Sequence, residues 1–406
     1  MRWRTGAEKQ AVEAMKVTAL AIREEARLEP DDSSMHAWAR QSQNREKIQA
    51  ALGLAESEES ISVNVDELDS DPLLLNLKNG TLELKGDFRF RPHNRADLIT
   101  KLSPITYDQD AQCPEFLKFI NRILPDQEVC EFVQRWFGYC LTGSISEQVF
   151  LAAFGEGANG KTQLLEVFRK ILGTDYTFNA TFGMFGRRAN GGLRPEMAQL
   201  KGVRLVTASD GGDGGGFEEE LIKQVTGGDA ITARLLYRNP IQFMPQFKMI
   251  FATNRKPTIE GQENAIWRRI RLVPFDVVIP EDDREQDIHA RLVREEASGI
   301  LNWAIHGLRR QQSTRLCPPS VVLAATKSYR DEEDVIGEFL RDRCEPVAIK
   351  EESSTDLYRA FWAWCDNRGE KPMSQKMFSL GLRRKGYQLV RKSWGKVFVG
   401  IGLKAA

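Results

Sequence analysis

A glycine-rich segment at residues 155–162 contains the residues whose types and spacing could do chemistry. It reads GEGANGKT and matches the pattern G-x-x-x-x-G-K-[ST] at every fixed position. Its glycines permit backbone angles that point successive N–H groups toward one anion. We expect Lys161 to reach the β- and γ-phosphates of a nucleotide and the Thr162 hydroxyl to hold Mg²⁺. The predicted nucleotide-binding set is Gly155, Gly157, Asn159, Gly160, Lys161 and Thr162.

The flanking sequence supplies the elements that such a loop needs. Residues 149–154 form an apolar run with the length of a buried strand. After the loop, apolar residues recur at helical spacing through residues 164–172. The pattern therefore predicts a strand, a glycine loop and a helix whose positive dipole end faces the anion.

Two further predicted strands end in polar residues. Residues 201–209 are followed by Asp210, and residues 248–253 are followed by Asn254. Since ligands gather at the carboxyl ends of parallel strands, Asp210 is placed to bind the metal, and Asn254 to hold a water against the γ-phosphate. Alternatively, Asp210 starts the glycine-rich turn that follows it, and Asn254 caps the turn before Pro257.

Three arginines stand within four positions, just before and within the next apolar run. Runs of charge are usually solvated faces, but the position of these residues after the Asn254 strand makes them candidates for an arginine finger. If the run is a strand, Arg269 and Arg271 share one face and Arg268 lies at its entrance. The predicted catalytic residues are Lys161, Asp210, Asn254, Arg268 and Arg269.

Two regions carry residues suited to nucleic acid. A predicted hairpin over residues 230–244 has Tyr237 and Arg238 at its tip, with Arg234 behind them. An aromatic and an arginine at a hairpin tip suit stacking on a base and contact with a nucleic-acid backbone. The alternative is that this tip is a solvated turn. The last 70 residues predict three short helices and a hairpin, a winged helix. Its third helix ends in three basic residues that suit duplex DNA, namely Arg383, Arg384 and Lys385. Many winged helices bind protein instead.

Composition limits the class of protein. The 406 residues include 57 basic and 57 acidic ones, so any contact with nucleic acid must be local. We find no run of about 18 apolar residues and no leader sequence, which predicts a cytoplasmic protein without membrane contact, in the host cytoplasm if a phage encodes it. Six cysteines and four histidines are scattered without a C-x-x-C pair, which argues against a zinc site or a disulfide framework.

Most of the chain carries compact segments in a fixed order: LLNLKNGTLEL, GEGANGKT, RLVTASD, LIKQVTGGDAITARLLYRNP, FKMIFATNRKP and IWRRIRLVPF, followed by the three-helix tail. On these segments the chain resembles superfamily 3 helicases of the phage, plasmid and poxvirus primase-helicase type. Together they are far more specific than any single motif.

Pattern and resemblance together predict an α/β fold with three domains. Residues 1–143 form an N-terminal helical and β-hairpin domain with a helical collar, residues 144–320 an AAA+ P-loop ATPase core with a parallel sheet, and residues 321–406 a small winged-helix-like domain. The resemblance implies an ATP-driven replicative DNA helicase of a phage, plasmid or other mobile element, a hexameric ring that moves 3′ to 5′. An origin-melting initiator or a loader-type ATPase without processive unwinding is the alternative, because both need the same site.

The resemblance also implies cofactors, partners and roles. The cofactors are ATP and Mg²⁺, and the partners are single-stranded DNA in the ring pore, duplex DNA at the C-terminal domain, further copies of the chain, and a primase domain or protein. Asn159 corresponds to the loop asparagine, Asn254 to the sensor, and Arg268, with Arg269 second, to the finger that acts on a neighbouring subunit. Tyr237 and Arg238 lie near the tip of the pore hairpin.

The sequence departs from the family at two places. The family usually has glutamate where this chain has Asp210, so Asp210 and Asp213 are both candidates for the general base. Nothing that resembles a primase domain precedes the helicase part. We therefore expect primer synthesis to reside upstream or in another polypeptide.

Overall fold

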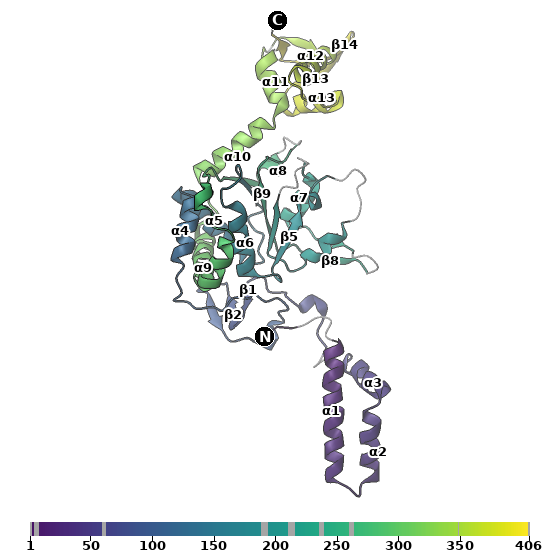
Figure 1. Cartoon of the computed structure of the whole chain (residues 1–406). Helices are drawn as coiled ribbons and strands as arrows, with labels where there is room; N and C mark the ends of the chain where they lie inside the picture. The colour runs from purple at the N-terminus through teal and green to yellow at the C-terminus, as the bar shows by residue number, and fades with distance from the viewer. Residues whose placement is uncertain are drawn as a thin grey trace.

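A five-stranded parallel sheet organises the chain (Figure 1). We analysed a computed structural model that describes residues 2–3, 8–58, 62–187, 194–209, 216–234, 239–259, 264–347 and 349–404. The strands run in the order β10-β4-β9-β6-β5, and each neighbouring pair is parallel. Their bounds are β4 (Phe150–Phe154), β5 (Thr177–Thr181), β6 (Leu205–Ser209), β9 (Lys248–Thr253) and β10 (Ile270–Pro274). The mixed α/β class with a parallel sheet is confirmed.

Both faces of the sheet are buried. In β4, Leu151 and Ala153 belong to one cluster of buried apolar residues, whereas Phe150 and Ala152 belong to a second. Because successive side chains of a strand point to opposite faces, the two clusters lie on opposite sides of the sheet. This burial explains why β4 and β9 are apolar over nearly their whole length.

Helices cover the two faces. The first cluster includes residues of α4 (Pro114–Ile123), α5 (Gln127–Cys140), α6 (Lys161–Leu172) and α9 (Ile288–Thr314). The second includes residues of α7 (Glu219–Gly227), α8 (Asn264–Trp267) and α10 (Ser320–Glu332). Within the described ranges, short 3-10 helices connect longer elements: η1 (Val65–Glu67), η2 (Arg95–Asp97), η3 (Phe182–Met184), η4 (Pro195–Leu200) and η5 (Glu281–Asp283).

Helices α5 and α9 approach each other closely through glycine. A Cβ atom added to Gly138 would overlap the backbone of Leu308 and Ala304, and one added to Gly307 would overlap the carbonyl of Gln134. The first cluster joins buried residues from 75–141 with others from 149–322. One continuous core therefore includes residues on both sides of the predicted domain boundary between residues 143 and 144.

The N-terminal part contains a helical unit and a small sheet. Helices α1 (Glu8–Leu28), α2 (Ser33–Ser42) and α3 (Arg45–Ala55) pack on one another and extend away from the five-stranded sheet (Figure 1). Strands β1 (Leu74–Leu77), β2 (Gly80–Glu83) and β3 (Arg89–Arg91) form an antiparallel sheet. The hairpin predicted at the Asn-Gly pair is present, because Leu77 pairs with Gly80.

The C-terminal part has a separate cluster of buried residues. It contains α11 (Val335–Arg343), β11 (Cys344–Glu345), β12 (Glu351–Ser353), α12 (Ser354–Asn367), α13 (Gln375–Arg384), β13 (Gln388–Lys392), β14 (Gly395–Val399) and β15 (Gly402–Leu403). Strands β12, β14 and β13 form an antiparallel sheet in that order. In the described ranges, no helix combines the length and apolar content needed to cross a membrane.

We predict that Gly138→Ala and Gly307→Ala each destabilise the protein by about 1–3 kcal/mol, because the added methyl group would force α5 and α9 apart. Urea unfolding followed by circular dichroism measures the change. Gly183→Ala is the matched control, since an added Cβ at Gly183 meets no atom within 4 Å. Equal midpoints for all three variants would contradict the close approach.

Candidate functional site

The glycine loop lies between β4 and α6, where the sequence predicts it. Gly160 has φ +81° and caps α6, and a Cβ there would lie 2.6 Å from Ile123 Cγ2. Glycine is therefore required at this position by both conformation and space. Asn159 is buried, and its side-chain amide donates a hydrogen bond to the carbonyl oxygen of Phe275 at 3.1 Å. The loop is thus tied to the segment that follows β10.

Lys161 is the first residue of α6, and its ammonium group is held inside the loop. Nζ donates hydrogen bonds to the carbonyl oxygen of Gly155 at 2.5 Å, to that of Glu156 at 3.3 Å and to Oδ1 of Asn254 at 3.1 Å. All three acceptors are neutral. Burial lowers the pKa of Lys161 to about 8, because the charged form loses hydration that these oxygens only partly replace.

This environment fits an anion. Among the described residues, no carboxylate forms an ion pair with Lys161, so its charge is left for a ligand to neutralise. The amide groups at the start of the 12-residue helix α6 point to the same place and favour negative charge. The exposed Thr162 hydroxyl, which the sequence predicts to hold Mg²⁺, follows Lys161 directly in α6.

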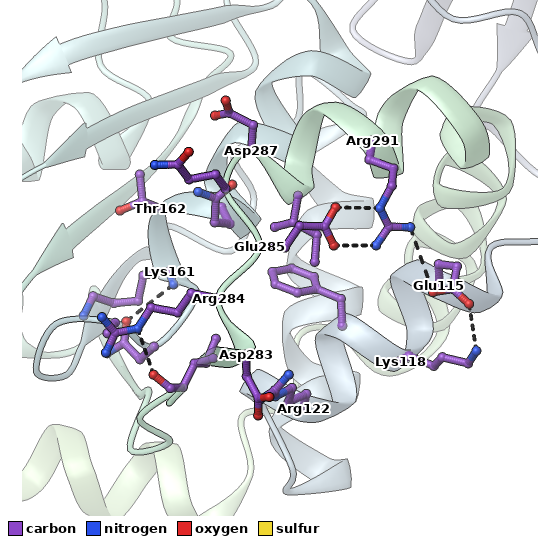
Figure 2. A pocket seen from close by; sticks show the side chains of 18 residues that line it. Glu115, Lys118, Arg122, Lys161, Thr162, Asp283, Arg284, Glu285, Asp287 and Arg291 are labelled. Atoms are coloured by element: carbon purple, nitrogen blue, oxygen red, sulfur yellow. Dashed lines mark hydrogen bonds and ion pairs between the residues drawn. The ribbon is translucent and has the colours of Figure 1, made fainter. Parts of the chain in front are cut away.

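A cavity of about 540 Å³ opens beside the loop (Figure 2). Its walls come from α4, from residues 158–163 and from residues 279–291. Ion pairs fix these walls: Arg291 with Glu285 at 2.7 Å, Arg122 with Asp283 at 2.6 Å and Lys118 with Glu115 at 2.7 Å. Our sequence analysis did not identify these wall residues, because they match no motif and lie about 40 and 120 residues from the loop in the chain.

The neighbouring strand ends lie in the expected order. Strand β9 lies between β4 and β6, so Asn254, which follows β9, is adjacent to the loop and contacts Lys161. Ser209, the last residue of β6, pairs with Ala252 of β9. Asp210 and Asp213, the predicted metal ligand and base, lie outside the described residues. All the catalytic and binding roles stay predictions.

The arginines have different environments. Arg269 is buried, and its guanidinium donates to Thr226 Oγ1 at 2.9 Å and to the carbonyl oxygen of Ala265 at 2.6 Å. It precedes β10 and connects α7 to α8. Arg271 donates to the carbonyl oxygen of Arg268 at 2.9 Å. The guanidinium of Arg268 is exposed and makes no hydrogen bond or ion pair within the described part of the chain, which leaves it accessible to a second molecule.

The residues predicted to bind DNA are only partly described. Strands β7 (Ile231–Ala233) and β8 (Ile241–Phe243) form the predicted hairpin, with exposed Arg234 directly after β7. Tyr237 and Arg238 lie outside the described residues. Arg383 and Arg384, both exposed, end α13, and Lys385 forms an ion pair with Asp334. The β7–β8 hairpin packs in the second cluster of buried residues, whereas α13 packs in the separate cluster of the C-terminal part.

Two family models match the chain. The model described as "D5 N terminal like" matches residues 1–125, and the model described as "Family of unknown function (DUF5906)" matches residues 153–269. The protein named "Putative helicase L207/L206" of Acanthamoeba polyphaga mimivirus is 29% identical over 322 residues, which cover 73% of this chain and 33% of that protein. A "Putative primase" of African swine fever virus is 20% identical over 327 residues, which cover 74% of this chain and 34% of that protein.

The matched N-terminal model and the viral relatives support a phage and viral primase-helicase family for this chain. The chain spans about a third of the length of these curated relatives. Among solved structures, the apo C-terminal region of NrS-1 covers 75% of this chain and 79% of its own, with 11% sequence identity and a TM-score of 0.45.

We predict that anion binding at the loop depends on the titration of Lys161. The free protein has a lysine pKa of about 8, so the ammonium that attracts the anion is present below this pH and is lost above it. Affinity for tripolyphosphate, measured by calorimetry, should fall up to about tenfold per pH unit above pH 8. In Lys161→Arg the charge does not titrate, so this variant controls for the titration of the ligand itself, and the ratio of wild-type to variant affinity should fall above pH 8. A ratio that stays constant from pH 7 to 9.5 would contradict the prediction.

Proposed function

We propose that this chain is the motor part of an ATP-driven DNA helicase. The observation that carries the proposal is the buried ammonium group of Lys161 at the start of α6, compensated by neutral oxygens and touching Asn254 at the end of the adjacent strand. A site of this kind suits phosphoryl transfer, in which positioning and electrostatics do most of the catalysis. The names of the viral relatives, helicase and primase, support DNA as the substrate.

The proposed mechanism assigns tasks to residues of the loop and of the neighbouring strand ends. Lys161 exchanges its bonds to loop carbonyls for bonds to the β- and γ-phosphates of ATP, because an anion stabilises its charge better than neutral oxygens do. Thr162 and Asp210 would hold Mg²⁺, which neutralises phosphate charge when bound. Asn254, released from Lys161, positions the attacking water, and Asp210 or Asp213 accepts its proton.

The quaternary part of the proposal is a ring of six copies that moves 3′ to 5′ on single-stranded DNA. Arg268 of one copy would reach the phosphates bound by the next, which its exposed and uncompensated guanidinium supports. The hairpin tip at Tyr237 and Arg238 would grip the strand, and the three helices and hairpin after residue 334 would act as a winged-helix-like domain on duplex DNA through Arg383, Arg384 and Lys385. Strand displacement on a forked substrate distinguishes a helicase from a loader or an origin-melting initiator.

We predict that Lys161→Ala reduces ATP turnover to below about a tenth of the wild-type rate, since no other described cation is held inside the loop. A phosphate-release assay measures it, and a circular dichroism melt shows whether the variant is folded. Lys170→Ala is the matched control, because it removes an exposed lysine from the last turn of the same helix. Turnover in Lys161→Ala comparable to that of the control would refute the site.

We predict that Arg268 acts on the neighbouring subunit. Arg268→Ala should lower ATP turnover by about 10³ to 10⁵ without lowering the melting temperature. Mixing it with Lys161→Ala protein should restore part of the turnover, because mixed interfaces pair an intact loop with an intact arginine. A mixture that forms joint assemblies but stays inactive would exclude Arg268 as the finger.

Arg269→Ala serves as the comparison for Arg268→Ala. It should lower the melting temperature, since it removes two hydrogen bonds of a buried guanidinium and leaves Thr226 and Ala265 without them. A normal melting temperature with lost turnover would instead favour Arg269 as the finger.

A further inference from the structure

The tip of the β13–β14 hairpin carries an exposed tryptophan. Lys392 pairs with Gly395, so Ser393 and Trp394 form a two-residue turn. The Trp394 side chain is 62% exposed, and it is not part of the cluster of buried residues that stabilises the C-terminal part. The hairpin is anchored by other residues, notably the fully buried Val397 and Phe398. Folding therefore does not explain a large aromatic ring at this tip.

Two basic residues next to the turn lie directly opposite each other on the two strands of the hairpin. Arg391 and Lys396 are cross-strand partners in the antiparallel pair. Like charges in this position destabilise a sheet. Neither side chain makes an ion pair with the part of the chain that the structure describes, whereas the neighbouring Lys392 pairs with Glu351 at 3.0 Å. A polyanion that neutralises both cations would remove the repulsion.

The combination of an exposed ring and two uncompensated cations suits a nucleic acid. Bases stack on aromatic side chains, and phosphates beside them are neutralised by lysine and arginine. Proteins that hold a length of single strand present several aromatics in succession. A two-residue turn presents only one ring, so it can accept one base, such as the base exposed where a duplex ends.

We propose that Trp394, Arg391 and Lys396 form a binding site for a duplex end, in which the indole stacks on the base at the junction and the cations contact the adjacent phosphates. The inference rests on the proposed function for its ligand class, and it names the feature of the DNA that the C-terminal part recognises. It differs from the contact assigned to Arg383, Arg384 and Lys385, which involves the side of a duplex.

The test uses the full chain and a forked DNA with 2-aminopurine, a fluorescent adenine analogue, at the first unpaired position. Stacking quenches this base, so wild-type protein should quench it at the junction more strongly than when it lies about ten nucleotides out along the single-stranded arm. Trp394→Phe should keep the quenching, and Trp394→Ala should lose it and bind the fork roughly fivefold to a hundredfold more weakly. The double variant Arg391→Ala, Lys396→Ala should reduce the salt dependence of fork binding by about two counterions.

Two readouts separate this inference from the proposed function. Trp394→Ala should keep the ATP turnover that single-stranded DNA stimulates, because the hairpin contributes nothing to the phosphate loop. Quenching and fork affinity in Trp394→Ala equal to those of the wild type would overturn the inference, and the indole would then be a contact for protein. Quenching at the junction by a wild type without DNA-stimulated turnover would support the duplex-end site and reject the helicase proposal.

Discussion

The site depends on a buried positive charge that neutral oxygen atoms hold in place. The ammonium group of Lys161 bonds to two loop carbonyls and to Asn254, so it links the loop, α6 and the end of β9. The hydration that the charge has lost is only partly replaced, which lowers the pKa of Lys161 to about 8. In the proposed mechanism, an anion that enters the loop gains this charge as a partner, and Asn254 loses its bond to Lys161.

The packing of α5, α6 and α9 positions the wall of the cavity beside Lys161. Helices α5 and α9 pack through Gly138 and Gly307, and Phe137 of α5 stacks on Phe168 of α6 with ring centroids 3.6 Å apart. Helix α6 is thereby held against both helices, and α9 begins at the end of the cavity wall formed by residues 279–291. Packing of glycine and aromatic residues outside the glycine loop thus decides where the walls of the site lie.

Adjacent arginines show how strongly the environment determines a role. Arg269 is buried against Thr226 and Ala265, where loss of its side chain would leave hydrogen-bonding groups without partners. Arg268 is exposed one residue earlier, and Arg271 bonds to backbone carbonyls. The three side chains are chemically identical. Of the three, Arg268 is the exposed residue, and its guanidinium forms no hydrogen bond or ion pair with the part of the chain that the structure describes.

The sequence by itself determined the local parts of this protein. The glycine loop, its flanking strand and helix, the Asn-Gly hairpin and the parallel sheet could be predicted, because each follows from the spacing of apolar residues and from the backbone freedom of glycine over a few positions. The order of the motifs also predicted a resemblance to primase-helicases, which the viral relatives support. The tertiary structure alone decided which side chains meet: that Asn254 contacts Lys161, that Arg269 is buried and Arg268 is not, and that α4 and residues 279–291 enclose the loop. These outcomes depend on contacts between segments 40 to 120 residues apart, and the periodicity of a single segment carries no information about the neighbour against which it will pack.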